Sequence, residues 1–173
     1  MRAWIALGLI LPLVAWAQVV GADGNFGDAG REDEAQAPRP EYPKPENYLP
    51  LQVSGTTPFV FFVDAKSVSV GKDGVVRYSL IAKSSDGALN VSFEGIRCSE
   101  HKFRIYAFGR PDNTWSEARS SLWQVMPADS RNAQRAVLYS DFFCPAGGII
   151  HTPEEGVQAL RSGRHPRATI SGY

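Results

Sequence analysis

Short apolar runs separated by turn sequences fill the middle of the chain and constrain its fold more than any other feature. The runs are PFVFFVD, KSVSV, VVRYSLIAK, ALNVSFEGIRC and HKFRIYAFG. The intervening GKDG and SSDG sequences supply the Gly and Asp that hairpin turns need where φ is positive. Consecutive strands of this kind usually lie beside one another. We therefore expect an antiparallel β-meander of about four to five strands over residues 59–109.

The last third of the chain carries helix signals instead. Residues 127–144 have apolar residues on one helical face, a candidate cap at Asp129 or Ser130, and a stop at Pro145. Pro153 opens a second, shorter helix with acidic residues in its first turn and an arginine in its last. A sheet followed by helices predicts an α+β fold.

The segment NVSFEGIRC at residues 90–98 changes its alternation halfway along. Apolar residues occupy odd positions up to Phe93 and even positions from Ile96 onward. A β-bulge at Gly95 would keep all of them on one face of the strand. The sequence therefore predicts a bulge that bends the sheet around the helix. A functional role for Glu94 beside the bulge is the alternative.

The same parity assigns a set of polar and aromatic residues to the opposite face of the sheet. Arginine together with aromatic residues is the composition of interface hot spots, whereas a plain solvated face is the common alternative. We predict that a partner or the Pro-rich arm of this chain docks here, and that Glu94 pairs with Arg104 across neighbouring strands. The candidate binding face consists of Arg77, Asn90, Ser92, Glu94, Arg97, Arg104, Tyr106, Phe108 and Trp115.

The N-terminus has the composition of a secretory signal peptide. A positive start precedes an apolar run that is short for a membrane span, and Ala15-Trp16-Ala17 forms an A-x-A cleavage site. We expect removal of residues 1–17 and export to the periplasm, with an uncleaved anchor as the alternative. No cysteine lies near the cleavage point, so we expect no lipid attachment and no stable membrane anchor.

Export changes the interpretation of the two cysteines, Cys98 and Cys144. Outside the cytosol an even pair is typical of one disulfide, and free thiols or a metal site are the alternatives. His101, His151 and His165 show no metal-ligand spacing. A disulfide would join the sheet to the first helix, and closing a loop of this length stabilises by about 4 kcal/mol in the chain-entropy model.

The composition of the chain after the signal peptide indicates a linker, a folded domain and a tail. Residues 18–50 resemble a linker that is disordered at first and then Pro-rich and extended, so it acts as a tether or as a PxxP ligand for a partner. Residues 51–162 form the single α+β domain. Residues 163–173 are expected to be a flexible tail.

No catalytic motif of the G-x-S-x-G, H-E-x-x-H, phosphate-loop or G-x-G-x-x-G type is present. Asp141 and His151 can approach Ser140 or Cys144 in space, but no motif supports such a set. Lys plus Arg and Asp plus Glu each number 18, and no basic run indicates nucleic-acid binding. We expect no enzyme activity, cofactor, metal or nucleic-acid partner. A small periplasmic hydrolase that uses Glu94 or Asp141 is the less favoured alternative.

Three segments closely resemble the cryptic neisserial protein family of exported bacterial proteins. They are FFVDAKSVSVGKDGVVRYSLIAKSSDGALNVSFEGIRC, FRIYAFGRPDNTWSEAR and LYSDFFCP, within residues 40–162. The resemblance implies a periplasmic protein, although some members look like lipoproteins and this chain lacks their lipid-attachment cysteine. No activity is established for the family, so no functional residue carries over. The interpretation that follows is a periplasmic, non-catalytic module that binds an envelope or protein partner.

A weaker similarity is to the surface adhesin protein E family. The residues that show this similarity are Phe62-Val63-Asp64 with Ser67, the segment Trp123–Pro127 with Ser130, and the two cysteines. This similarity implies a sheet packed on a helix and keeps surface adhesion as the alternative function. Fold alone does not carry function, so no residue role follows from it.

Overall fold

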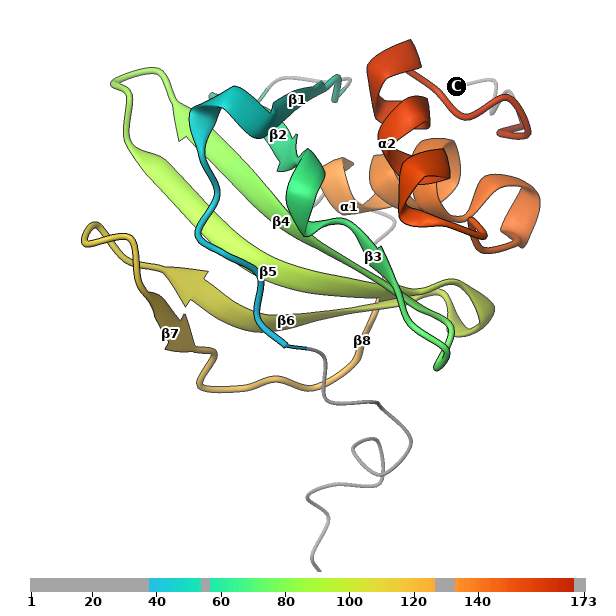
Figure 1. The fold of residues 1–173 in the computed structure, drawn as a ribbon, viewed down its shortest axis with the longest axis horizontal. Helices are drawn as coiled ribbons and strands as arrows, with labels where there is room; N and C mark the ends of the chain where they lie inside the picture. The colour runs from blue at the N-terminus through green and yellow to red at the C-terminus, as the bar shows by residue number, and fades with distance from the viewer. Residues whose placement is uncertain (1–37, 54–56, 127–132, 170–173) are drawn as a thin grey trace, which may run out of the picture.

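The computed structural model describes residues 38–53, 57–126 and 133–169, and in these residues an eight-stranded antiparallel sheet carries helices on one side (Figure 1). The expected signal peptide and the candidate caps Asp129 and Ser130 lie outside the described residues. The strands are β1 (Tyr48–Leu51), β2 (Phe59–Asp64), β3 (Ser69–Val70), β4 (Val75–Ser84), β5 (Leu89–Arg97), β6 (Lys102–Gly109), β7 (Trp115–Glu117) and β8 (Gln124–Val125).

The sheet is a meander, as its short connections predict. Its order is β1-β2-β4-β5-β6-β7, with β3 paired to β4 and β8 paired to β6. Gly74 and Gly87 have φ of 72° and 92° in the two predicted hairpin turns. The described residues contain more strands than the expected four to five because β1, β7 and β8 are too short to show a sequence alternation.

The predicted bulge in β5 is wrong. Phe93 lies opposite Ala107 and Glu94 lies opposite Ile105, so the extra residue is Tyr106 and the bulge belongs to β6. The apolar residues of β5 lie on both faces, because Phe93 and Ile96 are both buried on a regular strand. A central strand that is covered on both faces does not need one apolar phase. The apolar residues before the change in alternation, such as Phe93, are therefore buried on one face of the sheet, and those after it, such as Ile96, are buried on the other.

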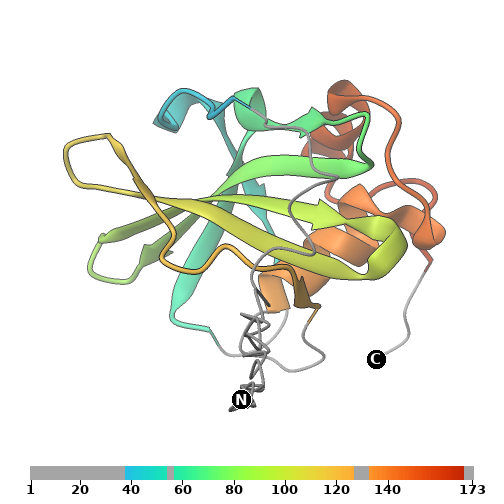
Figure 2. The same ribbon diagram turned by 90° about the horizontal axis from the view of Figure 1, so that it is seen from below.

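Two helical segments cover one face of the sheet, which we call the helix face (Figure 2). The first is α1 (Ala133–Val137), which continues as the π-helical turn η5 (Leu138–Phe143) and ends before Pro145. The second is α2 (Pro153–Ser162), where the Thr152 side chain caps the first turn and Gly163 ends the helix in the left-handed conformation. Both helix predictions are confirmed within the described residues.

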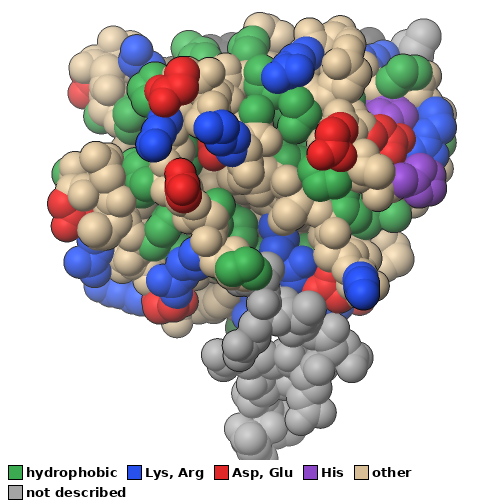
Figure 3. All heavy atoms as spheres, viewed as in Figure 1, with side chains coloured by type: hydrophobic (Ala, Val, Ile, Leu, Met, Phe, Trp, Pro, Cys, Tyr) green, Lys and Arg blue, Asp and Glu red, His purple; other side chains and the backbone are tan. Residues whose placement is uncertain are grey.

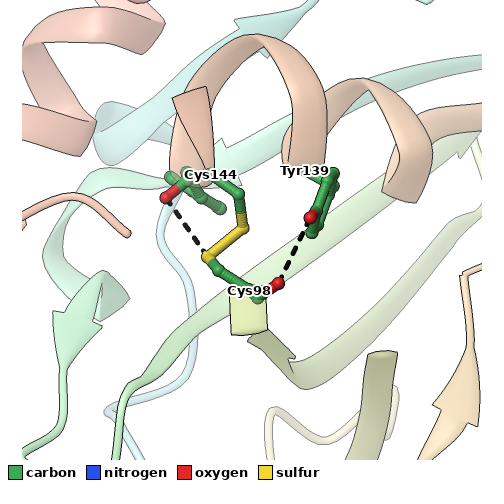
Figure 4. The surroundings of a disulfide bond; sticks show 4 residues. Cys98, Tyr139 and Cys144 are labelled. Atoms are coloured by element: carbon green, nitrogen blue, oxygen red, sulfur yellow. Dashed lines mark hydrogen bonds between the residues drawn. A yellow bond between two sulfur atoms is a disulfide. The ribbon is translucent and has the colours of Figure 1, made fainter. Parts of the chain in front are cut away.

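The core lies between the sheet and these helices. Val76, Tyr78 and Leu80 of β4 belong to it, and the Tyr78 ring lies 5.2 Å from the Phe143 ring. The predicted disulfide is confirmed: Cys98 and Cys144 are buried and bonded, with Cα atoms 5.5 Å apart. Figure 4 shows the bond where the end of β5 meets the end of η5.

The remaining 3-10 turns are one-turn connections. They are η1 (Pro45–Asn47), η2 (Ala65–Ser67), η3 (Cys98–Glu100) and η6 (Pro145–Gly147). The Tyr139 hydroxyl donates a hydrogen bond of 3.2 Å to the Cys98 carbonyl, which holds η3 against η5 beside the disulfide.

Both ends of the expected domain extend further than the sequence predicts. β1 begins at Tyr48, inside the range expected to be linker, and pairs with β2. Residues 163–169, expected to be a flexible tail, pack on α2: the His165 side chain is buried, and its imidazole lies 2.9 Å from the Glu155 carboxylate. Among the described residues, no helix is long and apolar enough to cross a membrane.

Candidate binding face

The residues of the predicted binding face lie on two different faces of the sheet. Glu94 lies opposite Tyr78 and Phe108 lies opposite Ser92, and residues opposite one another across antiparallel strands share a face. The helix face therefore holds Asn90, Ser92, Glu94 and Phe108. The other face, which we call the arm face, holds Arg77, Arg97, Arg104, Tyr106 and Trp115. The prediction of one shared outer face is wrong for Asn90, Ser92 and Glu94 because β5 carries no bulge, and for Phe108 because the bulge at Tyr106 shifts the alternation of β6.

Glu94 is fully buried and bonded to the first helix. Its carboxylate accepts hydrogen bonds of 2.6 and 2.8 Å from Arg135 of α1, and further bonds from the Tyr78 and Ser92 hydroxyls. Burial, and then the charge of Glu94, raise the pKa of Tyr78 well above its usual value, so this hydroxyl stays protonated and donates. The predicted partner Arg104 is wrong, because Arg104 lies opposite Gly95 on the arm face. Glu94 thus anchors a helix to the sheet.

The arm face carries a row in which guanidinium groups alternate with aromatic rings. Arg97 lies 4.4 Å from the Trp123 ring, and Arg104 lies 6.0 Å from that ring and 5.3 Å from the Tyr106 ring. Arg77 closes the row 5.8 Å from Tyr106. Each contact is within cation–π distance. The alternation of residues along the predicted strands placed the arginines and Tyr106 on one face. It did not predict Trp123, which reaches this face from the irregular segment after β7.

Charges within the row are partly compensated. The Arg77 guanidinium lies 2.5 Å from Asp73, and Arg97 lies 2.8 Å from Glu100. Arg104 donates a hydrogen bond of 2.9 Å to the Ser121 hydroxyl. Figure 3 shows acidic and basic side chains interspersed over the face seen there, as the zero net charge leads one to expect.

Gly95 makes room for the Tyr106 ring. A Cβ at this position would lie 2.6 Å from the Tyr106 hydroxyl oxygen and 3.0 Å from Val75 Cγ1. The ring also lies 5.2 Å from the Phe93 ring. Glycine in a strand often marks a site where another group approaches closely, and here that group is an aromatic side chain.

The Pro-rich segment, residues 38–47, crosses this face and is called the arm (Figure 1). The Trp115 indole N–H donates a hydrogen bond of 3.1 Å to the Pro40 carbonyl, and the Tyr42 ring lies 5.4 Å from the indole. The Tyr42 hydroxyl donates to the Arg110 carbonyl at 3.2 Å. Burial, and then the charge of Asp112, raise the pKa of Tyr42. Of the two predicted occupants, a partner and the Pro-rich arm, the structure places the arm against Trp115.

Open hollows flank the arm. One, of about 420 Å³, lies between Pro40 and the η2–β3 segment, above Phe93. The other, of about 370 Å³, is lined by Pro40, Tyr42 and Lys66 among others. The arm thus lines both hollows, and we call the surface beneath the arm together with these hollows the groove.

Of the contacts considered for catalysis, the structure contains the one between the neighbouring residues Ser140 and Asp141. The Ser140 hydroxyl donates a hydrogen bond to Asp141, which also lies 3.4 Å from Arg164, while Cys144 is in the disulfide. The His151 backbone N–H donates to Glu155. Among the described residues, no group of three or more His, Cys, Asp or Glu side chains is placed to hold a metal ion.

Comparison with known proteins identifies relatives of the chain. The model of the CNP1-like family matches residues 29–161. Cryptic neisserial protein 1 of Neisseria gonorrhoeae (strain ATCC 700825 / FA 1090) is 30% identical over 118 residues, which make up 60% of this chain and 57% of that protein. The chain thus covers less than two thirds of the length of this relative. No solved structure matches the chain.

Proposed function

Since this chain belongs to the CNP1-like family, a family of uncharacterised function, we propose from its own surfaces that it is an exported, non-catalytic binding module of the bacterial envelope. Its binding surface is the arm face of the sheet. The partner is a protein of the envelope, and the contact uses the guanidinium and aromatic side chains of this face.

One observation carries this proposal: the arm face already holds an extended segment through aromatic and hydrogen-bond contacts. The Trp115 indole donates to the Pro40 carbonyl while its ring packs against Tyr42. Binding surfaces for Pro-rich segments use this chemistry, in which aromatic side chains line a groove and contact a preformed extended backbone. Beside the arm, Arg104, Tyr106 and Trp123 are partly exposed. Aromatic and Arg side chains are the usual hot-spot residues of interfaces.

A non-catalytic role is supported by the contacts of the acidic and sulfur groups. The buried Glu94 carboxylate is bonded to Arg135, so moving a proton on or off it would break the link between sheet and helix. Cys144 has no thiolate to offer because it is in a disulfide. Export is supported by the composition of residues 1–17 and by the disulfide, which is stable in oxidising compartments.

The test is capture of envelope proteins on immobilised protein that starts at Gln18. Arg104→Ala removes one guanidinium from the row and leaves the core untouched, so its melting temperature should stay within a few degrees of the wild type, as is usual for surface changes. We expect the captured proteins to be lost with Arg104→Ala and retained with the control Arg161→Ala, which removes an exposed arginine on α2. Equal capture by both variants and the wild type would contradict a role for the arm face.

A further inference from the structure

We propose that the groove beneath the arm is a site for extended, Pro-rich segments of other proteins, and that residues 38–47 are its intramolecular occupant. A segment of the same chemistry replaces the arm when the partner binds. This inference rests on the proposed function, because it specifies the class of ligand that the arm face takes.

The groove recognises a feature that every Pro-rich segment has. A polyproline-type backbone makes no internal hydrogen bonds, so its carbonyl groups point outward and accept from the surroundings. The Trp115 indole N–H donates to one such carbonyl, that of Pro40, at 3.1 Å. This bond depends on the backbone of the ligand and is open to any segment that runs in the same direction.

Contacts of the Tyr42 side chain beside the indole add side-chain specificity. The Tyr42 ring, two residues after Pro40, packs close to Gly109, where a Cβ would lie 2.7 Å from the Tyr42 hydroxyl oxygen. The hydroxyl donates a hydrogen bond to the Arg110 carbonyl. Before the proline, Arg39 forms an ion pair with Glu117 of β7. The preferred ligand is therefore an extended segment of the form basic–Pro–x–Tyr.

The arm is held in a way that permits replacement. Strand pairing with β2 begins at Tyr48, and none of the described arm residues is part of a strand. The two hollows that Pro40 lines leave room for the side chains of a different segment. The tether nevertheless gives the arm an effective concentration of millimolar order, so an external segment must compete with it. Weakening the arm without changing the groove should therefore strengthen external binding.

The experiment titrates the protein starting at Gln18 with a synthetic peptide of residues 38–47, PRPEYPKPEN, and follows the Trp115 indole N–H by NMR. Tyr42→Ala in the protein removes the anchor of the arm and leaves Trp115, Gly109 and Arg110 in place. We expect the peptide to bind this variant about tenfold or more tightly than the wild type, because the competing arm is released. Trp115→Phe, added to Tyr42→Ala, should abolish the gain, with peptide binding followed by calorimetry.

A second peptide, in which alanine replaces the tyrosine, tests the anchor without any change in the protein. It should bind at least about tenfold more weakly, as expected for loss of an aromatic contact residue. Equal affinity of the wild type and Tyr42→Ala for PRPEYPKPEN would overturn the inference. So would dimerisation of Tyr42→Ala without peptide binding, since a second copy would then fill the groove. Neither of these outcomes changes the result of the capture experiment with Arg104→Ala, so the proposed function is tested separately.

Discussion

At the scale of single residues, Gly95 controls the position of the Tyr106 ring and hence the row of side chains on the arm face. Gly95→Ala would place a methyl group 2.6 Å from the Tyr106 hydroxyl oxygen and 3.0 Å from Val75. Because the ring must move, we expect a loss of about 1–3 kcal/mol in the free energy of unfolding, measured by urea denaturation. Gly148→Ala is the control, since a Cβ there has only ordinary contact, 3.8 Å from the Pro145 carbonyl oxygen.

The close contact between position 95 and the Tyr106 ring also predicts that a second substitution restores part of the lost stability. Tyr106→Leu shortens the side chain that lies over Gly95, so the double variant should lose less stability than the sum of the two single variants. Additive losses would mean that the ring is not what the glycine accommodates.

Glu155 holds the C-terminal segment to α2 through charge and hydrogen bonds. Burial alone would raise its pKa, but the His151 N–H, the Arg167 guanidinium and the His165 imidazole outweigh burial and lower the pKa from 4.5 to about 2. A carboxyl group with a lowered pKa in the folded state stabilises fully above its unfolded pKa, and this contribution is lost as the pH falls through the folded value. The window for Glu155 is therefore about pH 5 to pH 2.

Glu155→Gln should make the free energy of unfolding fall less steeply over that window. Urea denaturation at several pH values between 7 and 2 measures the slope. Glu154→Gln, which removes the neighbouring charge in the same helical turn, is the matched control and should follow the wild type. If both variants give the wild-type slope, the contacts of Glu155 do not contribute to acid stability.

At the scale of elements, one buried ion pair connects the first helix to the centre of the sheet. Arg135→Met would leave the fully buried Glu94 carboxylate without its cation, and breaking such a pair typically costs about 3–5 kcal/mol. We expect a loss of this size in the free energy of unfolding, measured by urea denaturation. Arg161→Met, on the exposed side of α2, should change stability by less than about 0.5 kcal/mol.

The double variant Glu94→Gln with Arg135→Met removes the charge from both sides of the contact. It should be more stable than Arg135→Met alone, because an uncharged amide is less costly to bury than an unpaired carboxylate. A double variant that is less stable than either single variant would show that hydrogen-bond geometry, and not charge, dominates this contact.

At the scale of the whole molecule, the sheet separates two kinds of surface. The helix face contains the disulfide, the buried ion pair and the core, whereas the arm face contains the arm and the arginine–aromatic row. Changes to the partly exposed side chains of the arm face, such as Arg104 and Trp123, should therefore alter binding more than stability. The proposed export of the protein places this surface in the envelope.

Export predicts a defined N-terminus for the mature protein. When the full chain is produced in a bacterium, N-terminal sequencing of the periplasmic fraction should show Gln18 as the first residue. Ala17→Arg, which puts a large charged residue at the cleavage position, should leave the precursor uncleaved. A mature protein that retains Met1 would contradict both cleavage and a periplasmic location.

Features that depend on neighbouring residues could be predicted from the sequence. The glycines of GKDG and SSDG placed the hairpins, Pro153 and the charges of the first and last turns placed α2, and a single pair of cysteines left one possible disulfide. These signals are local, because a turn or a helix cap is completed within a few residues. Docking of the arm on the face edged by Trp115 was one of the two alternatives that the sequence predicted, the other being a partner.

Only the tertiary structure decided which face each side chain of β5 occupies. A strand buried on both faces has no polar side to mark its orientation, so alternation alone could not place Glu94. Its partner Arg135 lies 41 residues further along the chain, and nothing near either residue indicates the pairing. The bulge at Tyr106 likewise follows from the register between β5 and β6. Contacts between distant segments depend on how the sheet and helices pack, and a local pattern carries no information about that packing.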